Sequence, residues 1–225
     1  MKEQRAFLSF MEQALNEAKS AALRGEVPVG AVVVFGGQVV ARAGNRTREL
    51  CDPTAHAEVL AIRAACAALG SERLTGHDLY VTLEPCAHHG KTPPCAEALS
   101  AAGIARVVTA LTDPDPRVAG RGHALLRAAG ISVTEGVLEQ AARDANVGFL
   151  KRITQGLPLV TLKMAATLDG RTATQSGESR WITGPQARRA VHALRLTHDA
   201  VLVGAGTARA DDPDLTVRDM GATRQ

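Results

Sequence analysis

The strongest constraint on this chain is a set of one imidazole, two thiols and one carboxylate between residues 56 and 95. His56 and Glu58 belong to the run H-A-E, Cys86 ends the run T-L-E-P-C, and Cys95 ends the run H-H-G-K-T-P-P-C. One histidine and two cysteines suit a catalytic zinc ion, whose fourth position stays open to water. The sequence therefore predicts a metal site made by His56, Cys86 and Cys95, with Glu58 beside it as a carboxylate that does not bind the metal.

The order of these residues also indicates a type of chemistry. His-x-Glu followed by Pro-Cys and a second cysteine is typical of zinc-dependent base deaminases. Zinc lowers the pKa of its water toward neutrality. We expect Glu58 to take the proton of that water and pass it to the ring nitrogen and then to the departing amine. The alternative is a structural zinc knuckle, although a structural site usually has four protein ligands and has no use for Glu58.

Size and composition narrow the class of protein. A chain of 225 residues permits one large domain, or one domain and part of another. A net charge of +3 lacks the dense basic patch of a dedicated nucleic-acid binder. Two of the four cysteines are assigned to metal, so Cys51 and Cys66 are predicted to be free thiols in a reducing compartment. No signal peptide and no bilayer-spanning run is apparent, so we expect a soluble, cytoplasmic protein without a membrane partner.

Hydrophobic patterns predict alternating helices and strands along the first 150 residues. Helices are expected over 4–23, 55–69, 93–102, 120–129 and 137–150, and strands over 29–35, 38–44, 79–83, 106–111 and 131–134. The two glycines at 36 and 37 predict a hairpin between the first two strands. This alternation indicates a three-layer α/β sandwich, in which ligands bind beyond the carboxyl ends of strands. Cys95 is expected at a helix N-terminus, where the helix dipole favours a thiolate.

The second part of the chain begins after a predicted linker over 152–158. We therefore expect one domain over 1–151 and a further segment over 152–225. Its patterns predict strands over 159–165 and 200–203 and a helix over 184–196. One helix and two strands are too few to close an independent core.

Longer motifs resemble two known families. From Cys86 onward, P-C-A-H-H-G-K-T-P-P-C, D-P-D-P-R-V-A-G-R-G and S-G-E-S-R-W-I-T resemble the bifunctional riboflavin-biosynthesis deaminase/reductase. Residues 1–86 resemble bacterial tRNA adenosine deaminase in E-V-P-V-G-A-V, G-N-R-T-R-E-L and D-P-T-A-H-A-E. Riboflavin enzymes usually show P-N-P-x-V-G where this chain has E-V-P-V-G, so the sequence reads as a hybrid. Both resemblances imply a three-layer α/β/α cytidine deaminase-like domain, followed here by an incomplete dihydrofolate-reductase-like segment.

The resemblances differ on the third metal ligand. The tRNA family would place it three residues after Cys86, which is His89 here, whereas the riboflavin family would place it at Cys95. The set carried over is His56, Cys86 and Cys95, and His89 is the alternative. His88 and His89 otherwise line the pocket or brace its loop.

Two further residues are candidates for substrate binding. Asn45 resembles the asparagine with which the tRNA family binds its target base, but it also suits an ordinary turn. Lys91 stands beside Gly90 near a predicted helix N-terminus and could contact a phosphate, or it could be a solvated surface lysine.

The riboflavin resemblance implies the opening of a reductase domain in the second segment. Family positions for NADP match Ala165, Trp181, Thr207 and Asp211, and those for the substrate match Ser179, Arg195, Leu215 and Arg218. A cofactor cleft without most of its walls cannot hold a nicotinamide for hydride transfer. We therefore expect no useful reductase activity, and NADP as a cofactor only if this segment functions.

Three functions stay open at this point. The first is zinc-dependent deamination of 2,5-diamino-6-(5-phosphoribosylamino)pyrimidin-4-one in riboflavin biosynthesis. The second is wobble-adenosine deamination with tRNA as the partner, and the third is a non-catalytic zinc-binding remnant. A homo-oligomer is expected in each case, because both families associate and the apolar strands of the second segment need covering.

Overall fold

The computed structural model describes residues 2–90, 92–218 and 220–221, with side chains from residue 7 onward. The chain divides into two compact units, Met1–Leu159 and Val160–Gln225. Each unit is described by itself below. The domain boundary predicted between residues 151 and 152 stays a prediction.

The first unit is built on one five-stranded sheet with the strand order β2-β1-β3-β4-β5. Its strands are β1 (Gly30–Phe35), β2 (Gln38–Gly44), β3 (Asp78–Val81), β4 (Arg106–Thr109) and β5 (Ser132–Thr134). β1 is antiparallel to β2 and β3, whereas β3, β4 and β5 are parallel. Gly36 and Gly37 have φ of 56° and 78°, so they form the predicted hairpin with a turn that favours glycine.

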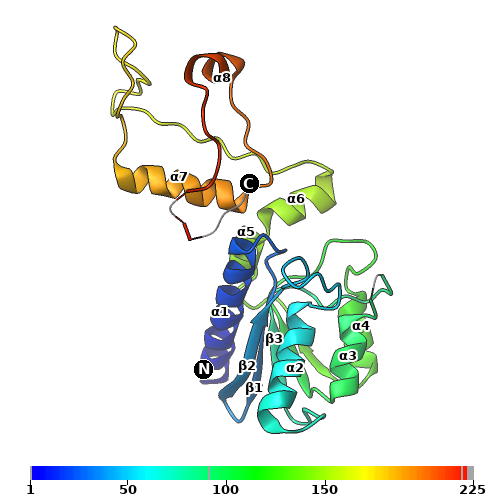
Figure 1. Cartoon of the computed structure of the whole chain (residues 1–225). Coiled ribbons are helices and arrows are strands. Elements are labelled where there is room, and N and C mark those ends of the chain that lie inside the picture. The colour runs from blue at the N-terminus through cyan, green and yellow to red at the C-terminus, as the bar shows by residue number, and fades with distance from the viewer. Residues whose placement is uncertain (1, 91, 219, 222–225) are drawn as a thin grey trace. The chain divides into compact units, whose positions relative to one another are not determined.

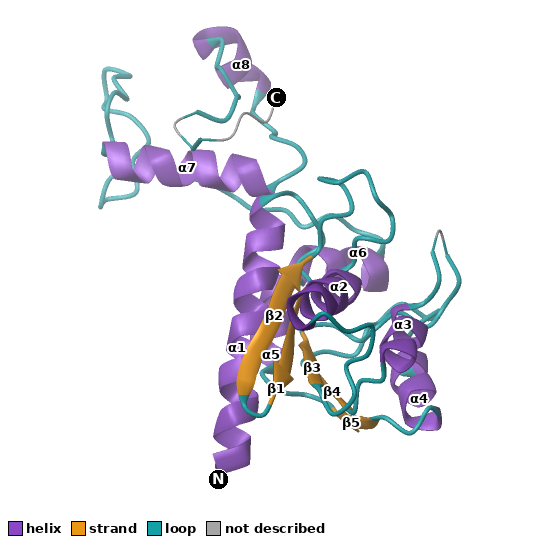
Figure 2. Ribbon diagram, turned by 60° about the horizontal axis from the view of Figure 1, so that its bottom comes forward, coloured by secondary structure: helices purple, strands orange, loops and turns teal. Residues whose placement is uncertain are grey.

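Helices cover both faces of this sheet (Figures 1 and 2). α1 (Lys2–Leu23) and α5 (Glu139–Ala145) lie on one face, and α2 (Ala57–Leu69), α3 (Cys95–Ala102) and α4 (Arg121–Ala128) lie on the other. The central strands β1, β3 and β4 are buried along most of their length, which suits their largely apolar sequences, whereas the edge strands β2 and β5 are partly exposed. The predicted three-layer α/β/α architecture is confirmed. No helix in the described ranges is both long and apolar enough to cross a bilayer.

Two glycines let α1 lie directly on the hairpin. A Cβ atom at Gly30 would lie 2.0 Å from the carbonyl oxygen of Ala14, and one at Gly44 would lie 2.6 Å from that of Glu17. Strand and helix backbones are therefore in contact at both positions. This packing fixes the end of β2, from which the loop to α2 starts.

Several element boundaries differ from their predictions. α2 begins at Ala57, because His56 has an extended backbone with φ −72° and ψ 152°. The predicted helix over 137–150 is two helices, α5 and α6 (Val147–Gln155), which are divided at Asn146. The side-chain amide of Asn146 donates to the carbonyl oxygens of Pro28 and Ala142. α6 runs to Gln155, so the first residues of the segment predicted to be a linker are helical, and the linker stays a prediction.

The second unit has helices but no strand among its described residues. α7 (Pro185–Thr197) confirms the helix predicted over 184–196, while the short α8 (Ala205–Asp211) was not predicted. The strands predicted over 159–165 and 200–203 were wrong, because neither segment pairs with another in the described part of the chain. Their side chains stay exposed, with Leu162 at 81% and Leu202 at 97%. An apolar alternating segment becomes a strand only where a partner strand takes its hydrogen bonds.

Candidate metal centre

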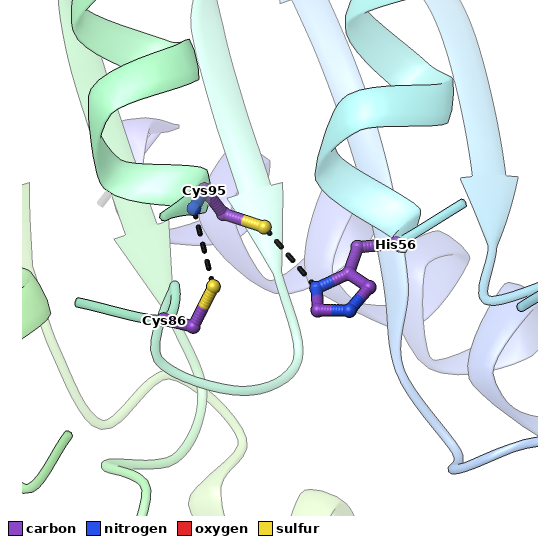
Figure 3. A group of neighbouring side chains, drawn as sticks. All are labelled: His56, Cys86 and Cys95. Atoms are coloured by element: carbon purple, nitrogen blue, oxygen red, sulfur yellow. Dashed lines mark hydrogen bonds between the residues drawn. The ribbon is translucent and has the colours of Figure 1, made fainter. Parts of the chain in front are cut away.

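Three different elements bring the predicted metal ligands together. His56 is the residue before α2, Cys86 lies in the loop after β3, and Cys95 is the first residue of α3. Figure 3 shows the three side chains pointing toward one another from these positions. Their ligand atoms, one imidazole nitrogen and two sulfurs, all lie within 4.8 Å of one another.

The distances fit a tetrahedral zinc ion. The Sγ atom of Cys95 lies 3.3 Å from Nδ1 of His56. Ligand atoms around tetrahedral zinc are separated by about 3.6–3.8 Å, given the usual zinc–sulfur and zinc–nitrogen bond lengths. Small side-chain movements therefore suffice for all three to bind one ion. One nitrogen and two sulfurs also form a soft ligand set of the kind that selects zinc over magnesium or calcium.

The start of α3 stabilises a thiolate at Cys86. The backbone N–H of Cys95 donates to Sγ of Cys86 at 3.1 Å, and the N–H of Ala96 donates to the carbonyl oxygen of Cys86 at 3.2 Å. Hydrogen bonding to the Cys95 thiol lowers the pKa of Cys86 to about 4. The same hydrogen bond, together with burial, raises the pKa of Cys95. Zinc binds cysteine in its deprotonated form, so the lowered pKa of Cys86 suits a metal ligand.

Glu58 lies beside this group as a buried carboxyl. It is in the first turn of α2 and is only 4% exposed. Burial raises the pKa of Glu58 to about 7. A carboxyl that titrates near neutral pH can both accept a proton and return it.

A cavity of about 510 Å³ opens at the metal site. Its lining residues are Thr47, Arg48, Cys51, Pro53, His56, Cys86, His88, Gly90 and Thr92. This volume is within the usual range for small-molecule sites. Two of the predicted ligands, His56 and Cys86, thus face a space that can admit a heterocycle.

Asn45 is buried at the beginning of the loop that leads to His56. It is 8% exposed, and its side-chain oxygen accepts a hydrogen bond from the backbone N–H of Ala57 at 2.8 Å. This bond satisfies one of the free N–H groups at the start of α2. Asn45 does not line the cavity, and its binding of a substrate base stays a prediction.

Sequence reasoning missed the buried carboxylate of Glu84, which ties the loop that carries Cys86 to the segment after β4. Glu84 accepts backbone hydrogen bonds from four residues of the segment that follows β4, namely Asp113, Gly120, Gly122 and His123. A Cβ atom at Gly122 would lie 2.0 Å from the carbonyl oxygen of Pro85, so that segment packs directly against the loop. The available signal was the Glu-Pro-Cys run itself, in which a charged residue follows a buried strand.

The histidines after Cys86 lie apart from the ligand cluster. Nε2 of His89 lies 3.1 Å from a carboxylate oxygen of Glu97, and the His89 side chain is 70% exposed. His88 lines the cavity, as expected for one of the two histidines. Lys91 lies outside the described residues. All four cysteines are free, as predicted for Cys51 and Cys66.

In the second unit, the structure brings together only part of the predicted reductase residues. Arg195 on α7 donates to the carbonyl oxygens of Asp214 and Thr216, and Arg218 pairs with the carboxylate of Asp214. Leu215 lies between Asp214 and Thr216, in the segment that Arg195 contacts.

The remaining predicted reductase residues lie elsewhere in this unit. Ser179 is exposed, and Trp181 contacts the guanidinium of Arg188. A second cavity, of about 650 Å³, lies over 167–182. None of the residues predicted to bind NADP lines that cavity, and these are Ala165, Trp181, Thr207 and Asp211.

Two family models match this chain, one in each of its two parts. A family model described as the cytidine and deoxycytidylate deaminase zinc-binding region matches residues 5–111. A second model, the RibD C-terminal domain, matches residues 158–225. The first match contains the ligand cluster and Glu58, and the second contains the whole of the second unit.

Curated proteins that are similar to this chain are riboflavin biosynthesis proteins. The riboflavin biosynthesis protein RibD of Escherichia coli is 51% identical over 190 residues, which are 84% of this chain and 49% of the relative. The chain spans about half the length of the curated relatives it matches.

Among the solved structures that are similar to this chain, one comes from each of the two families that the sequence resembles. The Thermotoga maritima diaminohydroxyphosphoribosylaminopyrimidine deaminase/5-amino-6-(5-phosphoribosylamino)uracil reductase is 41% identical with a TM-score of 0.87, and the match covers 99% of this chain and 62% of that one. A structure from a study of A-to-I editing by tRNA:A34 deaminases is 47% identical with a TM-score of 0.54. That match covers 61% of this chain and 98% of the other.

Proposed function

We propose that this chain belongs to the RibD family of riboflavin biosynthesis proteins and that its first unit is a zinc-dependent hydrolase that deaminates a phosphoribosylated diaminopyrimidine. The observation that carries the proposal is the convergence of His56, Cys86 and Cys95 beside the buried Glu58. A structural zinc site would need a fourth protein ligand, and the described residues of this cluster offer three.

Each ligand has a defined role in holding the metal. His56 would bind through Nδ1, the nitrogen that faces the sulfurs, and Cys86 and Cys95 would bind as thiolates. The N-terminus of α3 stabilises the negative charge of the two sulfurs. When bound, zinc supplies Lewis-acid activation of a water molecule.

Glu58 is the residue that we assign to proton transfer. Its carboxyl takes one proton from the attacking water and delivers it to a ring nitrogen, while the hydroxyl group adds to the carbon that bears the amino group. Glu58 then moves the remaining hydroxyl proton to the amine, the carbon–nitrogen bond breaks, and ammonia leaves. The product carries a carbonyl oxygen in place of the amino group, so the reaction consumes one water and needs no oxidant or reductant.

The first test is ammonia release from the phosphoribosylated diaminopyrimidine by the zinc-loaded full chain. Glu58→Gln keeps the volume of the side chain but removes the proton-accepting oxygen. We expect kcat to fall by at least about 100-fold, while bound zinc stays at the wild-type stoichiometry. If Glu58→Gln releases ammonia at the wild-type rate, Glu58 is not the proton-transfer residue. If the wild-type chain binds zinc but releases no ammonia, the proposed reaction is wrong.

A second candidate function is deamination of a tRNA adenosine. It is favoured by the 47% identity to the tRNA:A34 deaminase structure, of which this chain covers 98%. The same ammonia assay on an anticodon stem-loop, with inosine measured in the digested RNA, separates the two candidates. Inosine formation without turnover of the pyrimidine would establish the second one.

We also propose that the protein is located in the cytoplasm. Four free cysteines suit the reducing cytoplasm. We also propose a homo-oligomer, which light scattering on the purified chain tests directly. A monomeric mass at micromolar concentration would overturn that part.

A further inference from the structure

A further buried carboxylate, that of Glu26, is hydrogen-bonded to residues 47–49, two of which line the cavity. Glu26 is 6% exposed, and its Oε1 accepts hydrogen bonds from the backbone N–H groups of Arg48 and Glu49 at 2.8 and 2.9 Å. Its Oε2 accepts a hydrogen bond from the hydroxyl of Thr47 at 2.9 Å. A buried carboxylate with three such donors fixes the backbone that supplies them. Glu26 therefore determines where residues 47–49 lie.

Residues 47 and 48 form part of the cavity wall. Thr47 and Arg48 line the same cavity as His56 and Cys86. Nη1 of Arg48 donates to the carbonyl oxygen of Gly25 at 2.8 Å, which restrains the guanidinium and leaves its other N–H groups for further partners. The Arg48 side chain is thus held by Gly25, the residue before Glu26.

The charge of Arg48 is not neutralised within the described part of the chain. Its neighbours Arg24 and Arg46 both form ion pairs with Glu49, but no described carboxylate lies within ion-pairing distance of Arg48. The described lining of the cavity also contains no aspartate or glutamate. A cationic wall without a counter-charge favours ligands that carry an anionic group.

We propose that Arg48 is a specificity-determining residue that contacts an anionic group of the substrate, a phosphate monoester, and that Glu26 is the residue that positions it. The catalytic part of this inference rests on the proposed function, whereas the binding part does not. Glu26 and residues 47–49 lie in the runs E-V-P-V-G-A-V and G-N-R-T-R-E-L, where this chain differs from the P-N-P-x-V-G pattern that is usual in the riboflavin enzymes and resembles the tRNA family.

The kinetic test compares the phosphorylated substrate with its dephosphorylated ribosyl analogue on the zinc-loaded full chain. For Arg48→Ala we expect KM for the phosphorylated substrate to rise about tenfold, as for loss of one charge-assisted hydrogen bond. Its kcat and the kinetics of the analogue should change less than about twofold. Arg46→Ala is the matched control, because Arg46 is two residues away, pairs with Glu49 and does not line the cavity. Equal effects of Arg48→Ala on both substrates would overturn the proposal.

The positioning role of Glu26 has its own variants. Glu26→Gln keeps the Oε1 acceptor for Arg48 and Glu49, so its KM ratio between the two substrates should stay close to wild type. Glu26→Ala should lose the preference for the phosphorylated substrate, as Arg48→Ala does. The double variant should lose no more than either single one, because both changes remove one interaction. A drop of kcat on both substrates in Glu26→Ala, or additive losses in the double variant, would show a merely structural role.

A binding experiment separates this inference from the proposed function. Ribose 5-phosphate is titrated into the zinc-loaded chain by calorimetry, without any turnover. Binding that weakens about tenfold in Arg48→Ala but not in Arg46→Ala supports the anion site even if no pyrimidine is deaminated. Normal deamination with equal ribose 5-phosphate binding by wild type and Arg48→Ala would refute the inference and leave the proposed function intact.

Discussion

At the scale of single residues, the choice between Cys95 and His89 decides how the metal is held. Cys95 is 2% exposed and lies 3.3 Å from His56, whereas His89 is exposed and pairs with Glu97. We expect Cys95→Ser to weaken zinc binding by more than the roughly 10- to 100-fold loss that is typical of changes outside the ligand set, and His89→Ala to retain full zinc. Both values follow from competition with a chromogenic chelator and from metal analysis of the purified variants. Full zinc in Cys95→Ser together with loss in His89→Ala would reverse the assignment.

A second residue-scale prediction concerns pH. A hydrogen bond from the side chain of Arg117 lowers the pKa of Asp115 to about 2, below its usual value near 3.8. A carboxyl whose folded-state pKa is depressed stabilises the fold above its unfolded-state pKa, and this contribution is lost as the pH falls through the folded-state value. The difference in melting temperature between wild type and Asp115→Asn should therefore be largest above about pH 4, shrink as the pH falls, and vanish only below the folded-state pKa of about 2. A difference that grows on acidification would contradict the assigned shift.

The residues of the metal site could be predicted from sequence because their chemistry is rare and locally spaced. Imidazole and thiols in the runs H-A-E and E-P-C leave few alternatives to a zinc site. Glu26 and Glu84 could not be predicted in this way. Each is a single charged residue whose role comes from backbone N–H groups that are distant in sequence, such as those of Arg48 and Gly122. Such contacts exist only once the sheet has brought the loops together.

At the scale of elements, the close contact between α1 and the hairpin can be tested by adding a methyl group at Gly30. Gly30→Ala places a Cβ atom 2.0 Å from the carbonyl oxygen of Ala14 and 2.5 Å from the backbone nitrogen of Ala18. Backbone atoms cannot move aside as a flexible side chain can, so we expect the free energy of unfolding to fall by about 1–3 kcal/mol or more.

The matched control for that variant is Gly148→Ala in α6. A Cβ atom there meets only the side chain of Leu159, at 3.6 Å or more, and alanine favours the helix. This variant should be neutral or slightly stabilising in the same urea denaturation. If both variants are destabilised equally, the effect of Gly30→Ala does not come from a clash with α1, and the prediction is wrong.

Element boundaries were the part of the fold that periodicity predicted least well. The predicted helices include His56 and Asn146, but side-chain hydrogen bonds mark where the helices start and divide: Asn45 accepts from the backbone N–H of Ala57, and Asn146 donates to the carbonyl oxygen of Pro28. The strands predicted over 159–165 and 200–203 had a suitable pattern and were still wrong. A pattern describes which side chains can be buried, whereas a strand also requires a neighbour, which the described residues do not supply.

At the scale of the whole molecule, the two units differ in what holds them together. The first has a core of buried side chains from α1, the sheet and the helices on the opposite face. In the second, the buried hydrophobic side chains among the described residues are Leu196 and Val217. Stability and metal binding should therefore depend on the first unit.

This asymmetry leads to the last prediction, which concerns hydride transfer. The NADP positions implied by the family resemblance include Trp181, which is 72% exposed, and Thr207 and Asp211 on the exposed α8. Hydride transfer needs donor and acceptor atoms held at near-contact distance, and side chains spread over exposed segments do not provide this. We expect the full chain to release ammonia from the diaminopyrimidine without oxidising NADPH in the presence of the deaminated product, measured as constant absorbance of the reduced nicotinamide. Steady NADPH oxidation that depends on that product would show that residues 160–225 assemble a working cofactor site, and would overturn the prediction.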